Sequence, residues 1–377
     1  MDEASPQRSG PAPGRVLLLQ TAFVGDVIFT SPLVHAIKQA YPKARLTLMV
    51  RPAKAEVAAC IPGVDAVATF DKRGREAGLF GLLRAARKIR RQGFDLLIAP
   101  HRSTRSALLA QLSGVPLRVG YRSGLGRLCY HLALRPDGNE FCRLVQHQQL
   151  LRRVGIEPAG HKLRLKAPPH HHQLVTEFLR ANGLSCESRL VALCIGSVWP
   201  TKRWPPVYFA SLAESLFERG YRPVLFGGGD EIEIADEIER VVPGKVLSSV
   251  GNSLTETAAL IDRCEMAVGS DSGLTHMARA LGVPSVLIYG PTDSRQHRFE
   301  ERCQVLTAKV PCRPCSRQGH NRCPERHHDC MRLVSPEQVM DALRQIADVQ
   351  TPIPTDGERA RVADDRPRQP NRDAIEL

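Results

Sequence analysis

Asp26 is the first residue in this chain whose type and position suggest chemistry. It follows the apolar run Val16–Leu19 in the stretch LLLQTAFVGDVIFTSPL, where a strand is expected to end and a helix to begin. A small-residue loop there could hold a nucleotide cofactor. The carboxylate could instead cap the helix or remove a proton from a substrate hydroxyl. The Gly25-Asp26 pair by itself leaves these roles open.

The stretch GSDSGLTHMARALGVPSVLIYGPTD, residues 269–293, has the pattern of an anion site. A predicted strand leads into Asp271, Ser272 and Gly273 at the N-terminus of a predicted helix. Unpaired backbone N–H groups and the helix dipole favour anions at such an end. Gly273 would let a phosphate approach the backbone, Ser272 offers a hydroxyl, and His276 lies near the end of the first turn. The alternative is that Asp271 caps the helix and His276 packs in the core.

Two further charged loops follow predicted strands. In GSVWPTKRWPP, Lys202 could reach a diphosphate as a mobile cation, or it could be a solvated loop charge. In LFGGGDEIE, a carboxylate of Asp230 or Glu231 could accept hydrogen bonds from ribose hydroxyls. This glycine run is not GxGxxG, which argues against a nicotinamide-dependent dehydrogenase. The sequence also has no Asp-x-Asp pair to hold Mg²⁺ on a nucleotide diphosphate.

Four cysteines gather near the C-terminal end of the chain. Cys312, Cys315, Cys323 and Cys330 have histidines interleaved between them. The first pair has the spacing of a zinc knuckle, but the later spacings do not repeat it. A structural zinc site, free thiols that pack a loop, and redox pairing are all compatible with this pattern. Such a zinc ion would not be catalytic.

The positive charge is concentrated in the first half of the chain. The net charge is +13, and the segment from residue 72 to 135 holds fourteen Lys or Arg against two acidic residues, Glu76 and Asp95. Such a surface is expected to meet an anionic partner, the alternative being a merely solvated basic face. Aromatic residues make up only 5% and do not interleave with the basic ones, which argues against a nucleic-acid-binding protein.

The basic segment includes LLRAARKIRR, residues 82–91, which has helical apolar spacing. Leu82, Leu83, Ala86 and Ile89 form one stripe, which is more typical of a core face than of a membrane-inserted face. No apolar run approaches the ~20 residues that cross a bilayer. The first fourteen residues lack the apolar core of a signal peptide. We therefore expect a cytoplasmic protein.

The elements that must position these residues alternate between strand-like and helix-like segments, which predicts an α/β fold with parallel sheets. We expect strands at Arg15–Leu19, Arg45–Val50, Phe94–Ala99, Leu190–Ile195 and Pro223–Phe226, and in EMAVGS and PSVLIYG, the latter as the last strand. Helical spacing covers residues 27–40, with a break or kink near Pro32, and residues 79–91, 207–218 and 335–349. The chain length favours two domains, which we read as Rossmann-like units facing a cleft.

The motifs GDVIFTSPL, KRWPP, GSDSGLTHMARALGVPSVLIYGPTD and CRPCSRQGHNRCPERHHDCM occur in this order. Together they resemble the ADP-heptose–lipopolysaccharide heptosyltransferase family, glycosyltransferase family 9, in its heptosyltransferase II type. The resemblance covers residues 15–349. It implies a GT-B fold: residues 15–175 as the acceptor-binding domain, 176–350 as the nucleotide-sugar domain with the Cys-rich segment 312–330, and disordered tails at 1–14 and 351–377.

The same resemblance implies inverting, metal-independent transfer of heptose from ADP-heptose to the lipopolysaccharide inner core, with no required cofactor. Asp26 would be the catalytic base, and Lys202 would contact the diphosphate. Ser197, Asp271, Ser272, Gly273, His276, and Asp230 or Glu231 would bind the nucleotide sugar. Ala22 and Phe23 depart from the small hydroxyl residues expected before this motif, which affects acceptor contacts.

The resemblance also accounts for the basic first half. The acceptor would be a phosphorylated, carboxylate-bearing glycolipid, and residues 82–91 could lie along the anionic inner leaflet of the cytoplasmic membrane. We therefore expect a peripheral protein on its cytoplasmic face, with no nucleic-acid partner. The alternative function is a related GT-B transferase that uses another nucleotide sugar for a surface glycan.

Overall fold

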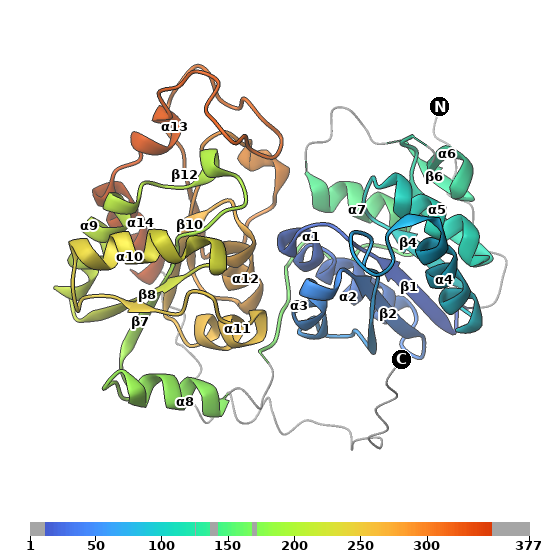
Figure 1. The fold of residues 1–377 in the computed structure, drawn as a ribbon, viewed down its shortest axis with the longest axis horizontal. Coiled ribbons are helices and arrows are strands. Elements are labelled where there is room, and N and C mark those ends of the chain that lie inside the picture. The colour runs from blue at the N-terminus through green and yellow to red at the C-terminus, as the bar shows by residue number, and fades with distance from the viewer. Residues whose placement is uncertain (1–11, 125, 136–141, 168–171, 349–377) are drawn as a thin grey trace.

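The computed structural model describes residues 12–124, 126–135, 142–167 and 172–348. They form two α/β units that lie side by side (Figure 1). Apart from residues 12–14, the tails predicted to be disordered lie outside the described residues. No described helix has both the length and the apolarity that a bilayer crossing needs.

The first sheet has six strands in the order β3-β2-β1-β4-β5-β6, and every pairing is parallel. The strands are β1 (Arg15–Leu19), β2 (Arg45–Val50), β3 (Ala66–Thr69), β4 (Leu96–Ala99), β5 (Leu117–Tyr121) and β6 (Leu132–Leu134). The associated helices are α1 (Val24–Ile28), α2 (Ser31–Ala40), η1 (Pro52–Lys54), α3 (Ala55–Ala59), α4 (Gly78–Arg91), α5 (Thr104–Ser113), α6 (Gly126–Cys129) and α7 (Arg143–Arg152).

The second sheet is also parallel, in the order β12-β11-β10-β7-β8-β9. The strands are β7 (Arg189–Cys194), β8 (Tyr221–Phe226), β9 (Leu247–Ser248), β10 (Met266–Ser270), β11 (Ser285–Ile288) and β12 (Cys303–Leu306). The associated helices are α8 (His172–Ala181), η3 (Pro200–Lys202), α9 (Pro206–Phe217), η4 (Gly229–Glu231), α10 (Ile232–Val241), α11 (Leu254–Asp262), α12 (Gly273–Leu281), η5 (Ser294–Gln296), α13 (Asp329–Arg332) and α14 (Pro336–Asp348).

Counted within its own unit, each sheet has the strand order 3-2-1-4-5-6 of a doubly wound nucleotide-binding fold. The central strands read as continuous apolar runs because helices cover both faces of a parallel sheet. Leu17 and Leu18 of β1, for example, are fully buried and belong to two different core clusters. The prediction of an α/β fold with two Rossmann-like domains is therefore confirmed.

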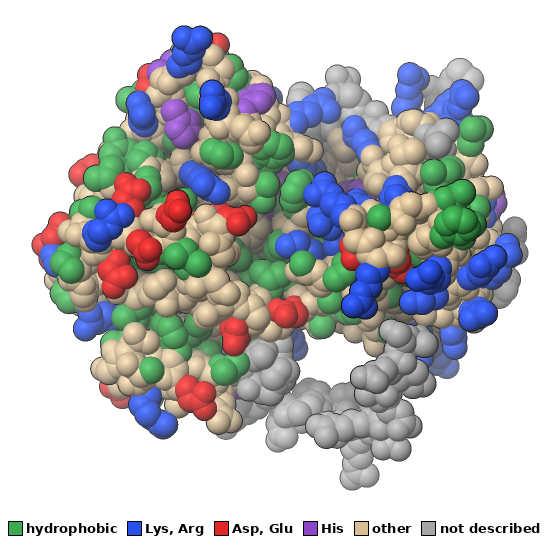
Figure 2. Space-filling view, viewed as in Figure 1, with side chains coloured by type: hydrophobic (Ala, Val, Ile, Leu, Met, Phe, Trp, Pro, Cys, Tyr) green, Lys and Arg blue, Asp and Glu red, His purple; other side chains and the backbone are tan. Residues whose placement is uncertain are grey.

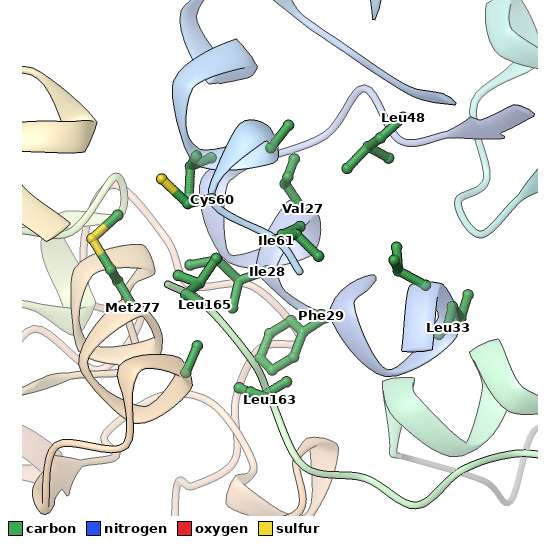
Figure 3. Close-up of a cluster of buried hydrophobic side chains, with 14 of the residues drawn as sticks. Val27, Ile28, Phe29, Leu33, Leu48, Cys60, Ile61, Leu163, Leu165 and Met277 are labelled. Carbon is green, nitrogen blue, oxygen red and sulfur yellow. The ribbon is translucent and has the colours of Figure 1, made fainter. Parts of the chain in front are cut away.

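The two domains share one apolar cluster (Figure 3). In the close-up, Leu163 and Leu165 of the linker lie beside Ile28 and Phe29, and Met277 of α12 lies on the opposite side. The linker backbone is tied to both domains. The Leu165 N–H donates to the Ala280 carbonyl at 2.8 Å, and the Lys166 N–H donates to the Cys60 carbonyl at 2.9 Å. The domain boundary predicted at 175/176 falls within α8.

The structure decides between the two alternatives predicted near Pro32 and corrects one predicted strand. A break and not a kink is found over residues 27–40: the chain breaks between α1 and α2, and the Thr30 hydroxyl donates to the Val27 carbonyl at 2.6 Å. Pro32 then lies in the first turn of α2, where its missing N–H costs nothing. In addition, PSVLIYG is not the last strand. It forms β11, and β12 follows at the edge of the sheet.

Helix α4 resolves the two interpretations of its apolar stripe. Leu82, Ala86 and Ile89 are buried in a core cluster of the first domain, and Leu83 is half-buried. The stripe therefore faces the protein, as a core stripe does, and is not open for insertion into lipid.

Candidate active site

The predicted site residues follow strands at the switch point of each sheet. In a doubly wound sheet the ligand crevice forms outside the carboxyl ends of the two strands where the order reverses. These strands are β1 and β4 in the first domain, and β7 and β10 in the second. Asp26 comes after β1, Ser197 after β7, and Asp271 directly after β10. The carboxyl end of β8 carries Asp230 and Glu231.

Asp271 is the centre of a buried polar network. Its Oδ2 atom lies 2.5 Å from the Lys202 ammonium and accepts a hydrogen bond from the Thr292 hydroxyl at 2.9 Å. Its Oδ1 atom lies 3.0 Å from His276 Nε2 and 3.5 Å from His297 Nε2. All four partners are side chains, so this carboxylate has no role left as a simple helix cap. Ser272, the N-cap residue of α12, makes no side-chain capping bond among the described residues.

The pKa of Asp271 reflects this network. Burial alone would raise the pKa of the carboxyl group, but the Lys202 ammonium and the hydrogen bonds from His276 and His297 outweigh burial. The pKa is therefore held well below its ordinary value. Asp271 stays ionised and is not suited to accept a proton from a substrate.

His276 is neutral, and its tautomer follows from its partners. Burial lowers its pKa to about 3, although the hydrogen bond to Asp271 opposes this shift. The Arg279 guanidinium lies 3.0 Å from His276 Nδ1 and can only donate, so Nδ1 must accept. The proton is therefore on Nε2, from which it is donated to Asp271. Arg279 is fixed in turn by Glu300, at 2.9 Å. The predicted core alternative for His276 is thus half right: the ring is buried, yet it orients Asp271.

The two switch points meet where α1 contacts α12. A Cβ atom on Gly25 would lie 3.6 Å from the His276 ring, and one on Gly273 would lie 3.1 Å from Val24 Cβ. Phe29 adds an aromatic contact across the same boundary, because its ring stacks on His297 with centroids 4.6 Å apart. Small residues on both helices allow this approach. It brings the first turn of α1, which contains Asp26, close to the N-terminus of α12.

Asp26 has fewer partners than Asp271. Its Oδ1 atom lies 2.7 Å from Arg143 Nη1 at the start of α7, and its Oδ2 atom accepts from the Phe23 N–H at 3.2 Å. The cap alternative therefore describes one of its two oxygens. The side chain is 14% exposed and that of Arg143 is 31% exposed, so solvent reaches this pair. The described residues give Oδ1 no second hydrogen-bonding partner.

Two neutral histidines lie in the electrostatic range of Asp26. Burial, reinforced by the Lys72 ammonium, lowers the pKa of His101 to about 4. Burial likewise lowers the pKa of His147 to about 4. His101 Nε2 lies 2.9 Å from the Ser106 hydroxyl and 3.1 Å from the Thr21 hydroxyl, which also accepts from Lys72 at 3.0 Å. This polar group follows the carboxyl ends of β1 and β4, the switch-point strands of the first domain.

The loop after β7 is held by Glu231. One of its oxygens accepts from the Gly228 N–H at 2.8 Å, and the other pairs with Arg203 at 3.1 Å. Arg203 also donates to the Ser197 carbonyl at 2.9 Å. Both Glu231 oxygens therefore have protein partners, whereas the side chain of Asp230 is exposed. Ser197 is buried in the same loop.

Several residues of the site carry no motif that identifies them in sequence. Arg143 is separated from Asp26 by 117 positions, and nothing in its local sequence marks the contact. Thr292 and His297 follow β11, and no role was predicted for either of them. His101 follows β4, and only the strand order of the sheet shows that β4 is a switch-point strand.

Three groups of the network could in principle share a metal ion, namely Asp271, His276 and His297, whose ligand atoms lie within 4.8 Å of one another. The hydrogen bonds argue for a different use. His276 Nε2 carries a proton, and the Lys202 ammonium already neutralises Asp271. As arranged, the atoms that face Asp271 are a cation and hydrogen-bond donors, and Nδ1 of His297, on the other edge of its ring, has no partner among the described residues.

The Cys-rich segment packs against the loop that carries Lys202. Thr201 donates to the His320 carbonyl through both its N–H, at 3.2 Å, and its hydroxyl, at 2.8 Å. His328 Nε2 lies 2.7 Å from the Thr201 carbonyl. The cysteine positions thus lie beside the candidate site rather than within it.

Comparisons with known proteins agree with this geometry. Residues 82–325 match the model of glycosyltransferase family 9 (heptosyltransferase). The chain is 26% identical over 347 residues to lipooligosaccharide heptosyltransferase 2 of Haemophilus ducreyi, a match covering 88% of this chain and 99% of that protein.

Among solved structures, a family 9 glycosyltransferase from Veillonella parvula superposes with a TM-score of 0.80 and 26% identity, over 88% of this chain and 97% of the other. The ADP-heptose lipopolysaccharide heptosyltransferase II of Escherichia coli gives a TM-score of 0.73 at 21% identity, over 88% and 98%. The likeness extends across both domains and supports the same architecture.

Proposed function

This chain belongs to glycosyltransferase family 9, and from that premise we propose that it transfers heptose from ADP-heptose to the inner core of a lipopolysaccharide. The observation that carries this proposal is the meeting of two unlike carboxylates at the contact between α1 and α12. One, Asp26, is 14% exposed and has one partner on each oxygen, and the other, Asp271, is 10% exposed and has both oxygens engaged by four side chains, among them the Lys202 ammonium. A transferase needs a base on the acceptor side and charge stabilisation on the donor side.

We assign Asp26 as the general base. Its partners leave lone pairs on Oδ1 that can accept the proton of an acceptor hydroxyl as that oxygen attacks the anomeric carbon. The bond to the ADP oxygen breaks in the same step, and ADP departs from the opposite face, which inverts the anomeric centre. Asp271 is unsuited to act as a second base or nucleophile, because both of its oxygens are engaged. A single available carboxylate supports the inverting route.

We assign the departing diphosphate to Lys202 and the N-terminus of α12. Asp271 holds the Lys202 ammonium in place, and the first backbone N–H groups of α12 lack a side-chain cap within the described chain. Both features present positive charge where negative charge develops on the leaving group. Transfer is then metal-independent, consistent with the absence of an Asp-x-Asp pair from the sequence. Ser197, Ser272, Gly273 and His276 complete this side of the site.

For the ribose, the exposed carboxylate of Asp230 is the better candidate. Glu231 is occupied by Gly228 and Arg203, so it would lose two protein partners on turning to a ligand. We therefore propose that Glu231 shapes the loop and that Asp230 is available for ribose hydroxyls.

The acceptor side is cationic. Burial lowers the pKa of Lys72, and the charges of Arg51, Arg73 and Arg105, which lie within electrostatic range, lower it further. Figure 2 shows Lys and Arg side chains over the first domain, including the edge of the hollow between the domains, whereas Asp and Glu gather on the second. Clustered cations suit the phosphates and carboxylates of an inner-core glycolipid.

Peripheral membrane contact would use the outer face of α4. Leu79 and Phe80 at its start are 66% and 83% exposed, and Arg84, Arg87 and Lys88 are exposed along the same helix. An exposed apolar tip beside basic residues suits the surface of an anionic leaflet. Such contact places the protein at the cytoplasmic face of the inner membrane.

A vesicle-binding assay tests this contact. We expect Leu79→Ser combined with Phe80→Ser, or neutralisation of Arg87, Lys88 and Arg91, to reduce sedimentation with anionic vesicles. Neutralising Arg219 and Arg240 of the second domain, which are also exposed, is the matched control and should change little. Equal loss in the control would point to general charge rather than to α4.

The reaction itself is tested by thermal stabilisation against ADP-heptose, UDP-sugars, GDP-sugars, NAD and oligonucleotides, followed by a transfer assay. We expect a selective shift with ADP ligands, and heptose transfer to a phosphorylated inner-core glycolipid. A shift with UDP- or GDP-sugars alone would favour a related GT-B transferase for another surface glycan. A shift with oligonucleotides alone would overturn the assignment.

A further inference from the structure

The Cys-rich segment, residues 312–330, contains no residue to which the proposed transfer reaction assigns a role. It leaves the second sheet after β12, passes beside the loop after β11, and returns through α13. Four of the eleven cysteines of the chain fall within these 19 residues. None of the four is in a disulfide.

The first pair of cysteines is anchored to the loop after β11. The N–H groups of Cys315 and Ser316 both donate to the Pro291 carbonyl at 3.1 Å. The Arg313 side chain, between the two cysteines, donates to the Gly290 carbonyl at 3.0 Å. Cys312 and Cys315 therefore sit in a turn fixed against Gly290-Pro291.

Cys330 reaches the same place from α13. A Cβ atom built on Gly290 would lie 3.1 Å from Cys330 Sγ, so the thiol rests directly on this glycine. Cys330 is buried, at 5% exposure. The turn that carries the first pair and the thiol of the last cysteine thus converge on one dipeptide.

Cys323 and His327 complete the cluster. The Arg326 N–H donates to the Cys323 carbonyl at 3.1 Å, closing a turn that brings His327 back toward the first pair. His327 Nε2 lies 3.9 Å from Cys312 Sγ. Burial raises the pKa of Cys330 to about 11, and the Cys315, Cys323 and Cys312 thiols add to this shift. Cys312, Cys315 and Cys323 thus each lie within electrostatic range of Cys330.

The charge of the segment suits four thiolates around a divalent ion. Four thiolates and one divalent cation carry a net charge of −2. The segment holds four arginines against Glu325 and Asp329, a balance of +2. Four sulfur ligands in tetrahedral array favour zinc, or iron among the commoner alternatives.

We propose that Cys312, Cys315, Cys323 and Cys330 bind one divalent transition-metal ion, with zinc expected, and that His327 supports the Cys312 thiolate as an outer hydrogen-bond partner. Binding releases the four thiol protons and leaves four metal–sulfur bonds. As the side chains stand, the described groups already close enough to share an ion are those around Asp271. The four cysteine side chains would therefore have to rotate to bring their sulfurs together around the ion. A histidine N–H donated to a metal-bound sulfur is a common outer-sphere arrangement.

Such a site would brace the loop that carries Lys202. Thr201 is bound by His320 and His328 of the segment. A Cβ atom on Gly319 would meet both Trp199 Cβ, at 2.6 Å, and Lys202 Cγ, at 3.2 Å, so the segment touches the side chain of the lysine itself. A metal ion that fixes the segment would thereby fix Lys202. This consequence, unlike the metal site, rests on the proposed role of Lys202 at the diphosphate.

Metal analysis of the full-length protein, purified without a metal-chelating tag, tests the site. We expect one equivalent of zinc or iron per chain by mass spectrometry, released on titration of the thiols with a mercurial reagent. Cys312→Ser and Cys330→Ser should each retain at least tenfold less metal. Cys186→Ser is the matched control, because Cys186 is exposed and far from the segment in sequence, and it should retain full metal.

Wild-type protein that lacks both metals, even when produced in zinc-supplemented medium, would overturn the site, as would full retention by both variants. The mercurial titration uses the wild type, so the result does not depend on how well the variants fold. ADP affinity, measured by calorimetry before and after metal release, tests the bracing. About tenfold weaker binding is expected after release. Unchanged affinity with stoichiometric metal would remove the bracing and leave the site.

Discussion

Asp26 and Asp271 both follow switch-point strands of domains with the same topology, the first strand of one domain and the fourth strand of the other, and their surroundings differ. Asp271 is fully engaged by Lys202, His276, Thr292 and His297. Asp26 has one ion pair and one capping bond, and solvent reaches it. A carboxylate after a switch-point strand can thus be either a fixed counter-ion or an available proton acceptor. The number of donors around the carboxylate decides between them, and each prediction below tests that difference.

The largest effect is expected from Asp26→Asn. The amide cannot take the acceptor proton, so turnover should fall by about 10²–10⁴-fold while ADP binding is retained. Steady-state kinetics and calorimetry with ADP measure the two quantities separately. Near-normal turnover would remove Asp26 from the role of base and make it a helix-capping residue only.

Asp271→Asn should instead act mainly on stability. Removing one partner of a buried ion pair leaves the Lys202 ammonium uncompensated, which typically costs about 3–5 kcal/mol. Urea unfolding measures this free energy. Asp341→Asn is the control, because its ion pair with Arg344 is exposed and should contribute less than about 1 kcal/mol. Similar losses in both variants would contradict the contrast between the two aspartates.

Acid should destabilise the protein through its buried neutral histidines, which occur beside both aspartates. The pKa of His276 is lowered to about 3, and those of His101 and His147 to about 4. Between these values and about 6.5 the unfolded chain binds protons that the folded chain does not, so stability falls as the pH falls through this window. Each histidine contributes about 1.4 kcal/mol per pH unit.

Denaturant unfolding at several pH values from 7 to 4.5 measures this dependence. His147→Gln should reduce the slope of the unfolding free energy against pH by close to the contribution of one proton, whatever the effect of the substitution on stability at pH 7. Asp271 does not contribute in this window, because its lowered pKa keeps it ionised and its stabilisation is lost only at more acidic pH. An unchanged slope in the variant would mean that His147 is not held neutral.

The smallest effect is expected for Arg143→Gln. The Arg143–Asp26 pair is partly exposed, so the unfolding free energy should change by less than about 1 kcal/mol. Turnover should fall by about tenfold, because Asp26 loses the group that orients it. Arg143→Lys should restore part of the turnover without a change in ADP affinity. Arg152→Gln, which removes an exposed pair with Glu157, is the control and should have no effect.

Much of the fold could be predicted because it depends on local patterns. Arg15–Leu19 and Arg45–Val50 were predicted with the bounds of β1 and β2, since continuous apolar runs between polar breaks are typical of buried parallel strands. The strands β3, β5, β6, β9 and β12 were not predicted. Apart from β5, which is buried, they consist mostly of half-buried residues and carry little apolar signal. A break or kink was predicted near Pro32, but only the structure shows that the chain breaks before α2 and that the Thr30 hydroxyl bonds the Val27 carbonyl there.

The residues of the site also fall into those that the local sequence marks and those that it does not. The block from Asp271 to His276 and Lys202 could be recognised because their spacing within single loops is encoded locally. The roles assigned to them from resemblance stay predictions until the variants are measured. Arg143 could not be found, because it lies 117 positions from Asp26. Thr292 and His297 lie close to Asp271 in the sequence, but their contacts with it depend on how the loop after β11 packs against the loop after β10.

The sequence by itself determined the class of fold, the family, the excess of positive charge in the first half, and the residue types available at each strand end. Each of these is a property of composition or of short-range order. Only the tertiary structure decided that Asp271 is surrounded by donors while Asp26 is left open. That difference depends on which loops the two sheets bring to one crevice and on the close contact between Gly25 and α12, and no local pattern specifies either.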